Sequence, residues 1–281
     1  MAGLPQGASS LPDHDPALES GLEVGSAVGP VSKLPAERVE AIEVVISDEM
    51  AGLGIPGLSV AIAHEYTSLE EGLSLFKDDP LEFEPGTQFL YTTYGYSLLG
   101  CAIEGVTGRP FPDVLHELVL LPSGMTRTRP EDVRGLIPNR ARGYVRVDPG
   151  ILINAALADM SYKVPGGGLS STAPGVARFG LALISGRLLA PESLEEMLTP
   201  ADRDENDSRG YGLGMSVDER EGRREAWHSG GQEGVSTVLY LRPDGGPVVA
   251  MLTNLQGLGP RLLGLAREVG DLVSAGSDDS R

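Results

Sequence analysis

Hydrophobic positions follow helical spacing at the start of the patterned part of the chain and then change to a strand-like run. The segment PAERVEAIEVVISDEMAGLGI, residues 35–55, carries apolar residues on one helix face, and this pattern ends at Gly52 or Gly54. The run GLSVAIA at 57–63 has the length and the β-branched content of a short buried strand. A helix followed by a strand is therefore predicted here.

The centre of the chain is predicted to be mostly helical. Helices are expected near 68–77, 95–107 and 112–120, where apolar residues recur at three- and four-residue spacing. Gly108 ends the second of these helices, and Pro112 lies in the first turn of the third, where each residue type is favoured. We interpret this part as a helical insert.

From residue 211 the pattern changes to strands. Three runs, YGLGMSV (211–217), VSTVLYL (235–241) and PVVAMLTN (247–254), are predicted as antiparallel strands, with RPDGGP as a hairpin turn between the last two. The segment 260–275 is predicted as an amphipathic helix. The expected fold class is α+β, with an antiparallel sheet at the two chain ends, flanked by terminal helices.

Composition and charge narrow the class of protein. The 281 residues are 41% hydrophobic, which is enough for one sizeable core. The net charge of −18 argues against nucleic acid or an anionic membrane surface as a partner, and no apolar run has the length of a membrane span. A single cysteine, Cys101, is predicted as a small core residue. One cysteine cannot form a disulfide framework. The four histidines are far apart in sequence, so no local metal site is indicated. No cofactor is indicated either.

The two ends of the chain differ from the rest in composition. Residues 1–34 are rich in Gly, Pro, Ser and acidic residues and are predicted to be a disordered arm. They show no signal-peptide pattern and no arginine of a mitochondrial transit peptide, so a soluble cytoplasmic protein is the default expectation. Residues 276–281 are expected to be a disordered polar tail, which leaves 35–275 as the folded domain.

The stretch WHSGG, residues 227–231, places a serine beside a histidine and two glycines. An α/β-hydrolase nucleophile lies in G-x-S-x-G and has its histidine later in the chain. Here Trp227 replaces the first glycine, and no histidine follows His228. On a strand, moreover, the side chains of His228 and Ser229 would point to opposite faces. Ser229 is therefore not expected to be the nucleophile.

A serine can instead be activated by a lysine one helical turn later, in the pattern S-x-x-K. Among three lysines, Lys77 is the one with this spacing, after Ser74 in SLFK. The helix is expected to begin at a capping box at Ser68 and to stop at 78–80, so Ser74 and Lys77 occupy its last turn. The helix dipole there disfavours an alkoxide. We interpret the pair as a solvated helix end, with a catalytic pair as the alternative.

Several stretches resemble the serine β-lactamase-related family, which includes class C β-lactamases, DD-peptidases and related esterases. EPGTQFLYTTYGYSLLG is similar to the segment with the family's Tyr-x-Asn motif, here Tyr91-Thr92-Thr93 with threonine in place of asparagine. IPGLSVAIA resembles the family's first strand, and HSGG resembles its Lys/His-x-Gly motif. SLFKDDPLEFEPGTQFLY and SYKVPGGGLSST look most like the family's mitochondrial members. The resemblance covers roughly residues 35–272.

This resemblance implies acyl-serine hydrolysis of an amide or ester bond. Tyr91 would be a general acid/base, and His228 would orient or polarise the substrate. The substrate-binding residues would be Thr93 together with Ser229, Gly230 and Gly231, on a strand whose N–H groups help to bind an oxyanion. A core or interface tyrosine remains the alternative for Tyr91, and a half-buried strand histidine remains the alternative for His228.

Further expectations concern partners, location and a nearby loop. The implied partner is a small-molecule or peptide substrate, and a mitochondrial location is a further expectation from the resemblance. A homo-oligomer is expected for another reason, because loss of sheet strands would expose strand edges and apolar surface. The residues Gly166, Gly167 and Gly168 form either a site-edge loop or a tight connection, and the tight connection is favoured.

One departure from the family pattern bears on activity. The family carries S-x-x-K well before Tyr-x-Asn, on a long buried helix, whereas Tyr91 lies only 17 positions after Ser74 here. We infer that a block is missing between about 63 and 66, so the expected β-lactamase/transpeptidase-like fold is internally shortened. The expected function is a hydrolase that is catalytically impaired. The alternative is a non-catalytic pseudoenzyme that acts as a binding or self-assembly module.

Overall fold

The computed structural model describes Val44 and residues 68–200 and 210–278 of the 281-residue chain. Two compact units make up the chain, Met1–Ala61 and Ile62–Arg281, and the description below concerns the second. The strand predicted at 57–63 and the junction at 63–66 lie outside the described residues, as does the helix predicted within 35–55 apart from helical Val44.

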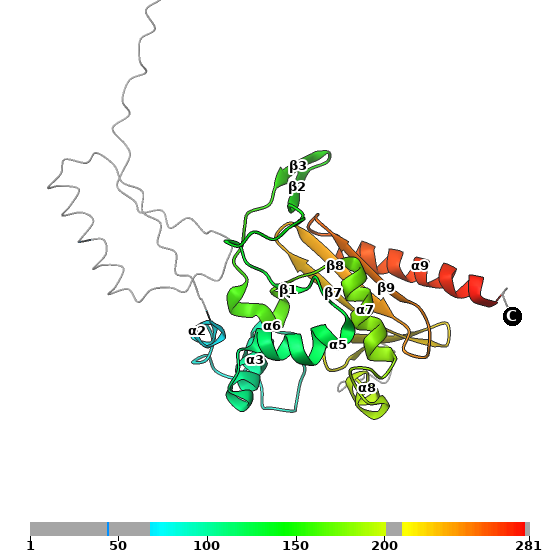
Figure 1. Ribbon diagram of the computed structural model, residues 1–281, viewed down its shortest axis with the longest axis horizontal. Coiled ribbons are helices and arrows are strands. Elements are labelled where there is room, and N and C mark those ends of the chain that lie inside the picture. The colour runs from blue at the N-terminus through cyan, green and yellow to red at the C-terminus, as the bar shows by residue number, and fades with distance from the viewer. Residues whose placement is uncertain (1–43, 45–67, 201–209, 279–281) are drawn as a thin grey trace, which may run out of the picture. The chain divides into compact units, whose positions relative to one another are not determined.

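A five-stranded antiparallel sheet lies at the centre of the described body (Figure 1). Its strands lie in the order in which they occur along the chain, so each one pairs with the next. They are β5 (Gly210–Tyr211), β6 (Ser216–Arg220), β7 (Arg223–Gln232), β8 (Val235–Leu241) and β9 (Val248–Thr253). Short turns suffice to connect them because antiparallel neighbours can be joined by tight hairpins.

The predictions for 235–241 and 247–254 are confirmed by β8 and β9, but the prediction of one strand over 211–217 is wrong. The chain reverses after Tyr211, so that Tyr211 pairs with Ser216 of the next strand. Gly214 adopts a φ of 98° in this turn, a conformation that glycine reaches without strain. The sequence pattern did not show the ten-residue β7, because its glycines and polar residues lack an alternating hydrophobic signal.

Helices cover both faces of the sheet (Figure 1). Helix α9 (Gly259–Asp278) packs against one face of the sheet, where its Leu262 and Ala266 form a buried cluster with Val238 and Tyr240 of β8. Helix α7 (Ala173–Ile184) lies on the opposite face, with α8 (Pro191–Met197) near its edge. The second buried cluster consists of Leu198, Met215, Val217, Ala226 and Leu241. Successive β8 residues enter different clusters because strand side chains alternate between faces, and each buried aliphatic side chain contributes roughly 1.5–3 kcal/mol.

The predicted central helices are present with altered ends. They are α2 (Leu69–Leu73), α3 (Thr93–Thr107), α4 (Phe111–Leu115), the π-helical η1 (His116–Leu120) and α5 (Leu121–Ser123). Helix α3 begins before residue 95 because the Thr92 hydroxyl caps it, accepting from the Gly95 N–H at 3.3 Å. Gly108 ends α3 in the left-handed conformation, and Pro112 lies in the first turn of α4, as predicted.

The last predicted helix is confirmed by α9, which runs to Asp278. It thus includes the first three residues of the segment 276–281 that was expected to follow it as a tail. Within the residues that the structure describes, no helix has the length and apolar character needed to cross a membrane.

Several small elements were not predicted from the sequence. They are the paired β1 (Arg129–Pro130) and β4 (Leu169–Ser170), the hairpin of β2 (Tyr144–Asp148) and β3 (Ile151–Asn154), the 3-10 helix η2 (Ser161–Lys163) and α6 (Val164–Gly167). The β2–β3 hairpin projects from the body in Figure 1, and Ile151, Leu152 and Ile153 on it are exposed. Its hydrophobic residues do not mark a core, so hydrophobicity alone would misplace it.

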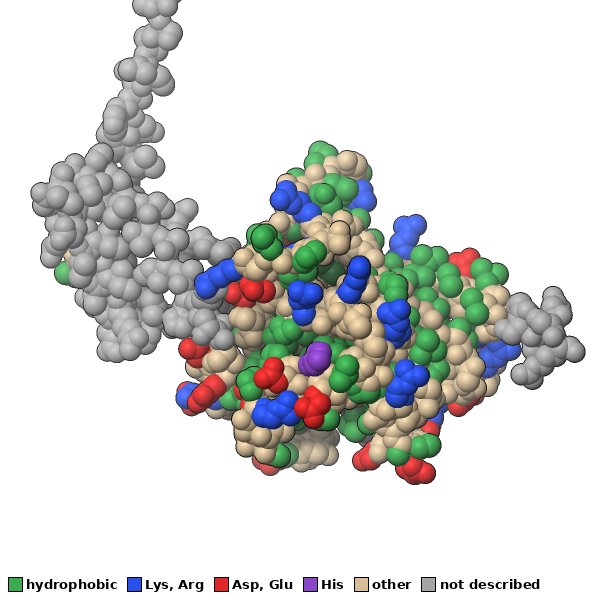
Figure 2. Space-filling view, viewed as in Figure 1, with side chains coloured by type: hydrophobic (Ala, Val, Ile, Leu, Met, Phe, Trp, Pro, Cys, Tyr) green, Lys and Arg blue, Asp and Glu red, His purple; other side chains and the backbone are tan. Residues whose placement is uncertain are grey.

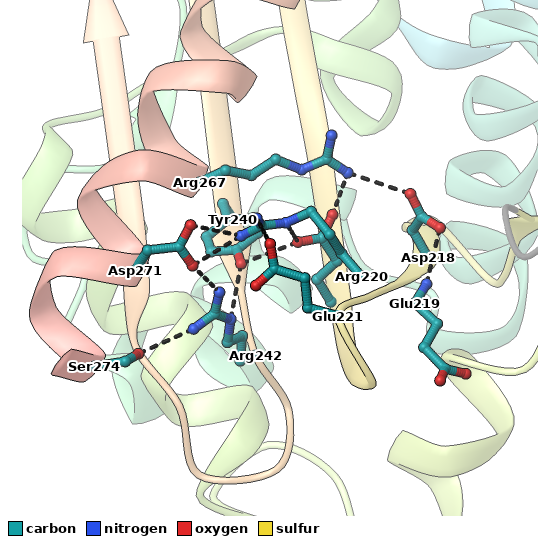
Figure 3. A network of polar contacts seen from close by, with 10 residues as sticks. Asp218, Glu219, Arg220, Glu221, Tyr240, Arg242, Arg267, Asp271 and Ser274 are labelled. Carbon is teal, nitrogen blue, oxygen red and sulfur yellow. Dashed lines mark hydrogen bonds and ion pairs between the residues drawn. The ribbon is translucent and has the colours of Figure 1, made fainter. Parts of the chain in front are cut away.

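An ionic network joins α9 to the sheet (Figure 3). Asp271 of α9 accepts from Arg220 of β6 at 2.8 Å and also from Arg242, so its pKa lies below the usual 3.8. Glu225 of β7 is 1% exposed, and its carboxylate accepts hydrogen bonds from Arg267, Tyr240 and Arg220. Such buried charges are tolerated where they are paired and hydrogen-bonded. The network therefore ties α9 to the strand that carries WHSGG.

Candidate functional site

Two residues 137 positions apart in sequence meet at the candidate site. The hydroxyl of Tyr91, which lies just before α3, is 3.5 Å from Nε2 of His228 on β7. Their rings stack with centroids 6.2 Å apart. The distance is at the long end for a hydrogen bond, so the two groups are in reach without forming a tight bond. The side chain of Tyr91 is 54% exposed, which argues against the core-tyrosine alternative.

A third aromatic residue, Tyr211 of β5, completes this cluster. Its ring meets those of Tyr91 and His228 edge-on, at centroid distances of 5.8 and 6.4 Å, and it also packs against Phe89. Burial, followed by the neighbouring Tyr96 and Tyr91, raises the pKa of the Tyr211 hydroxyl above its usual 10, so this hydroxyl stays protonated at neutral pH. Sequence reasoning missed Tyr211. Its position before the turn at Gly212–Gly214 was the available signal.

The orientation of His228 follows from the alternation of β7. Trp227 points to the α9 side, where the guanidinium of Arg267 lies 4.9 Å from its ring centroid. His228 points to the other face because adjacent strand residues alternate. There it is half-buried, and burial lowers the pKa of its imidazole below the usual 6.5. A neutral imidazole keeps one nitrogen free to accept a proton or a hydrogen bond.

We expect the imidazole of His228 to titrate with a midpoint below 6.5, because burial disfavours the charged ring. A pH series of imidazole carbon–proton NMR spectra would measure this midpoint, with assignment by the His228→Gln variant. A midpoint at or above 6.5 would contradict the proposed burial of this side chain.

The last residues of β7 have a strand partner on one side within the described part of the chain. Strand β6 pairs with β7 as far as Trp227, whereas β8 pairs with it as far as Gln232. Between these points, alternate N–H and C=O groups point away from β8. No described strand forms hydrogen bonds with these groups. The N–H groups of this edge can therefore donate to the carbonyl oxygen of a bound substrate or to a developing oxyanion.

The two glycines after Ser229 differ in the space around them. A side chain at Gly230 would come within 2.5 Å of the Thr237 hydroxyl, whereas one at Gly231 would meet no atom within 4 Å. Ser229 is exposed and lies on the opposite face from His228, as the alternation predicted. A Ser229–His228 catalytic pair is therefore not formed.

The triple glycine packs tightly between α3 and the site. A Cβ at Gly166 would come within 2.7 Å of the backbone oxygen of Thr93, and one at Gly168 within 2.5 Å of that of Met160. The favoured reading of a tight connection thus has structural support, yet the loop also borders the site at Gly167, close to Gln232. Thr93 contacts this loop, and the helix cap is provided by Thr92.

The sequence SLFK does not form a Ser–Lys pair. Ser74 caps the C-terminal end of α2, and its hydroxyl donates to the backbone oxygen of Glu71 at 2.6 Å. Lys77 is exposed, and no hydrogen bond joins it to Ser74 within the described part of the chain. These contacts support the solvated helix end, including the cap in which Ser68 accepts from the Glu71 N–H.

The wider surroundings combine several kinds of side chain. On the face drawn in Figure 2, hydrophobic side chains lie around a histidine, and both basic and acidic side chains are found nearby. The described residues hold no group of three or more His, Cys, Asp or Glu side chains arranged to bind a metal ion. The phenol groups of Tyr91 and Tyr211 and the imidazole of His228 can take part in hydrogen bonding and proton transfer.

The amino-acid sequence of this chain is similar to that of a known protein family. The Beta-lactamase family model matches residues 50–273. Serine beta-lactamase-like protein LACTB, mitochondrial, of Mus musculus is 33% identical over 232 residues, which cover 67% of this chain and 41% of the relative. The chain thus spans about two fifths of the length of that relative.

Solved structures agree with this assignment. The octameric penicillin-binding protein homologue from Pyrococcus abyssi is 26% identical, with a TM-score of 0.62 over 79% of this chain and 51% of that one. A D-stereospecific amidohydrolase from Streptomyces is 25% identical, with a TM-score of 0.60 over 67% and 57% of the two chains. The α+β fold with its antiparallel sheet is therefore of the penicillin-binding and β-lactamase-like type, and this chain belongs to the beta-lactamase family of serine hydrolase-like proteins.

Proposed function

We propose that this protein keeps a substrate-binding cleft of the β-lactamase-like hydrolases but is impaired in acyl-serine chemistry. The observation that carries the proposal is the contrast between two parts of the molecule. The Tyr91–His228 pair and the free edge of β7 lie together. The one serine with S-x-x-K spacing, Ser74, is instead bonded to its own helix backbone.

The chemistry of an intact site explains why this matters. A serine hydroxyl would attack the carbonyl of an amide or ester, and Tyr91 would take up its proton and return it to the leaving group. N–H groups at the end of β7 would bind the negative oxygen of the intermediate, while His228 would orient the substrate. Without a positioned serine no acyl-enzyme forms, and loss of a nucleophile costs several orders of magnitude in rate.

The proposed internal shortening would account for the absence of a positioned nucleophile. The alignment with the mouse relative extends over 232 residues, but it includes 67% of this 281-residue chain, which is fewer than 232 residues. The alignment therefore has gaps on the side of this chain, and loss of a block is one change that leaves such gaps. The domain would then extend from 35 to 275.

Intact-mass measurement tests the impaired chemistry. The wild type and Ser74→Ala are incubated separately with a fluorophosphonate and a penicillin, after circular dichroism has shown both to be folded. We expect no covalent adduct on either protein. An adduct on the wild type that is absent from Ser74→Ala would show that SLFK works as a catalytic pair. An adduct on both would show another active serine, and either result would overturn the proposal.

A second candidate function, binding or self-assembly without turnover, is favoured by exposed apolar surface. Helix α3 exposes Leu99, Ile103 and Val106, which lie on one face at spacings of four and three residues, together with Leu98. The Pyrococcus relative is described as octameric. Native mass spectrometry of the same samples should show more than one chain per particle, and a monomer at every concentration would contradict this candidate.

The name of the mouse relative supports mitochondria, in preference to the cytoplasm, as the compartment we propose for this protein. Fractionation of cells that produce it would show the protein in the mitochondrial fraction, and recovery in the cytosol alone would refute the assignment.

A further inference from the structure

Lys163 is a half-buried lysine beside the candidate site. It ends η2, and its amine donates to Oε1 of Gln232 at 3.2 Å. Burial lowers the pKa of this amine from its usual 10.5. Within the described part of the chain, no carboxylate forms an ion pair with it. An amide oxygen satisfies one of its three donors without neutralising its charge.

Gln232 lies on the same face of β7 as His228. The two residues are four positions apart, and alternate strand residues share a face. Gly230 lies between them on that face and has no side chain. The Cα atoms of His228 and Gln232 are therefore roughly 13 Å apart along the strand, at about 3.3 Å per residue, with the side chain of Thr237 beside Gly230.

The amide of Gln232 has a donor left over. Its oxygen accepts from Lys163, and no described residue accepts from its Nε2. That nitrogen lies 3.3 Å from where a side chain at Gly167 would begin. An ammonium and an amide N–H side by side suit the two oxygens of a carboxylate.

We propose that Lys163 and Gln232 bind a carboxylate on a substrate arm that extends along β7 from the Tyr91–His228 pair. The inference rests on the proposed substrate cleft and adds the chemical class of its ligand: a peptide-like compound whose acidic end lies two or three residues from the reacting bond. Such a cation is needed because the chain's net charge of −18 otherwise repels acidic ligands.

The rigid surroundings of Lys163 suit a binding role. Val164, which follows it, is buried, and Gly168 closes α6 against the backbone of Met160. The loop is held against α3 at Thr93, next to the Tyr91 segment. Both ends of the proposed site are thus placed by packed backbone, so little ordering remains to be done when a ligand binds.

The test compares N-acetyl-triglycine with its C-terminal amide, by chemical-shift titration in proton–nitrogen NMR spectra of the full chain. The wild type should bind the acid about tenfold more tightly than the amide, a difference of about 1.4 kcal/mol. Lys163→Met should abolish this preference and Lys163→Arg should keep part of it. Lys77→Met, which removes an exposed lysine far from Gln232 in sequence, is the matched control and should retain it.

Three results would overturn the inference: equal binding of acid and amide by the wild type, a preference that survives in Lys163→Met, or acetate binding as tightly as N-acetyl-triglycine. The last would indicate a site for free anions. The readout is binding, so it is separable from catalysis. Selective binding without a covalent adduct supports both proposals, whereas selective binding with an adduct overturns only the impaired chemistry.

Discussion

Replacing Glu225 by glutamine is expected to lower the free energy of unfolding by about 3–5 kcal/mol, the cost of removing one partner from a buried ion pair. Glu225 is 1% exposed and accepts from Arg267, Arg220 and Tyr240. Glutamine has the same shape but no charge. Asp271 and Asp218 would remain as partners of Arg220 and Arg267. Because Asp271 is shared with Arg242, these two carboxylates would face three arginines.

Urea denaturation followed by circular dichroism would measure this loss, and the melting temperature should fall by roughly 6–20 °C. The matched control is Glu117→Gln, because Glu117 pairs with Arg109 at 2.8 Å on the surface and both side chains are about half exposed. That change should cost less than about 1 kcal/mol. Equal losses for the two variants would contradict the structural role of the network.

The second large effect is expected for Gly212→Ala, which should destabilise the protein by about 3 kcal/mol, at the upper end of overpacking costs. A Cβ at residue 212 would lie 2.2 Å from the backbone oxygen of Met197. That oxygen accepts from the Leu213 N–H at 2.8 Å, so the chain cannot move aside without breaking this bond. Because Gly212 follows Tyr211, the site should be disturbed as well.

Denaturant unfolding measures the stability loss, and the imidazole NMR signal of His228 reports on the movement of Tyr211. Gly105→Ala serves as the control, since a Cβ there meets nothing within 4 Å and lies inside α3. It should stabilise the protein by up to about 1 kcal/mol, because alanine favours helix more than glycine does. A Gly212→Ala variant as stable as the wild type would refute the close packing of this turn.

Both Glu225→Gln and Gly212→Ala should affect the candidate site, because each disturbs a support of β7 or of its neighbour Tyr211. Glu225 and Trp227 hold one face of β7 against α9, while His228 on its other face meets Tyr91 and Tyr211. Disturbing either support should therefore change the candidate site without altering any residue that would contact a substrate.

The sequence by itself determined the elements whose signals are local. Periodic apolar residues and end signals such as Gly108 and Pro112 placed the central helices, and apolar runs placed β8, β9 and α9. Motif resemblance gave the family and led to Tyr91 and His228. The end signals at Ser68 and at 78–80 indicated that Ser74 and Lys77 lie at a helix end; in the structure α2 already ends at Leu73, and Ser74 is its C-cap.

Tertiary structure decided what depends on contacts between distant segments. The meeting of Tyr91 with His228 and Tyr211, the Lys163–Gln232 contact and the ionic network under α9 join residues from separate elements. No pattern within a window of ten or twenty residues encodes such contacts. They arise because the pairing of β7 with β8 and the packing of α3 and α6 bring these side chains together.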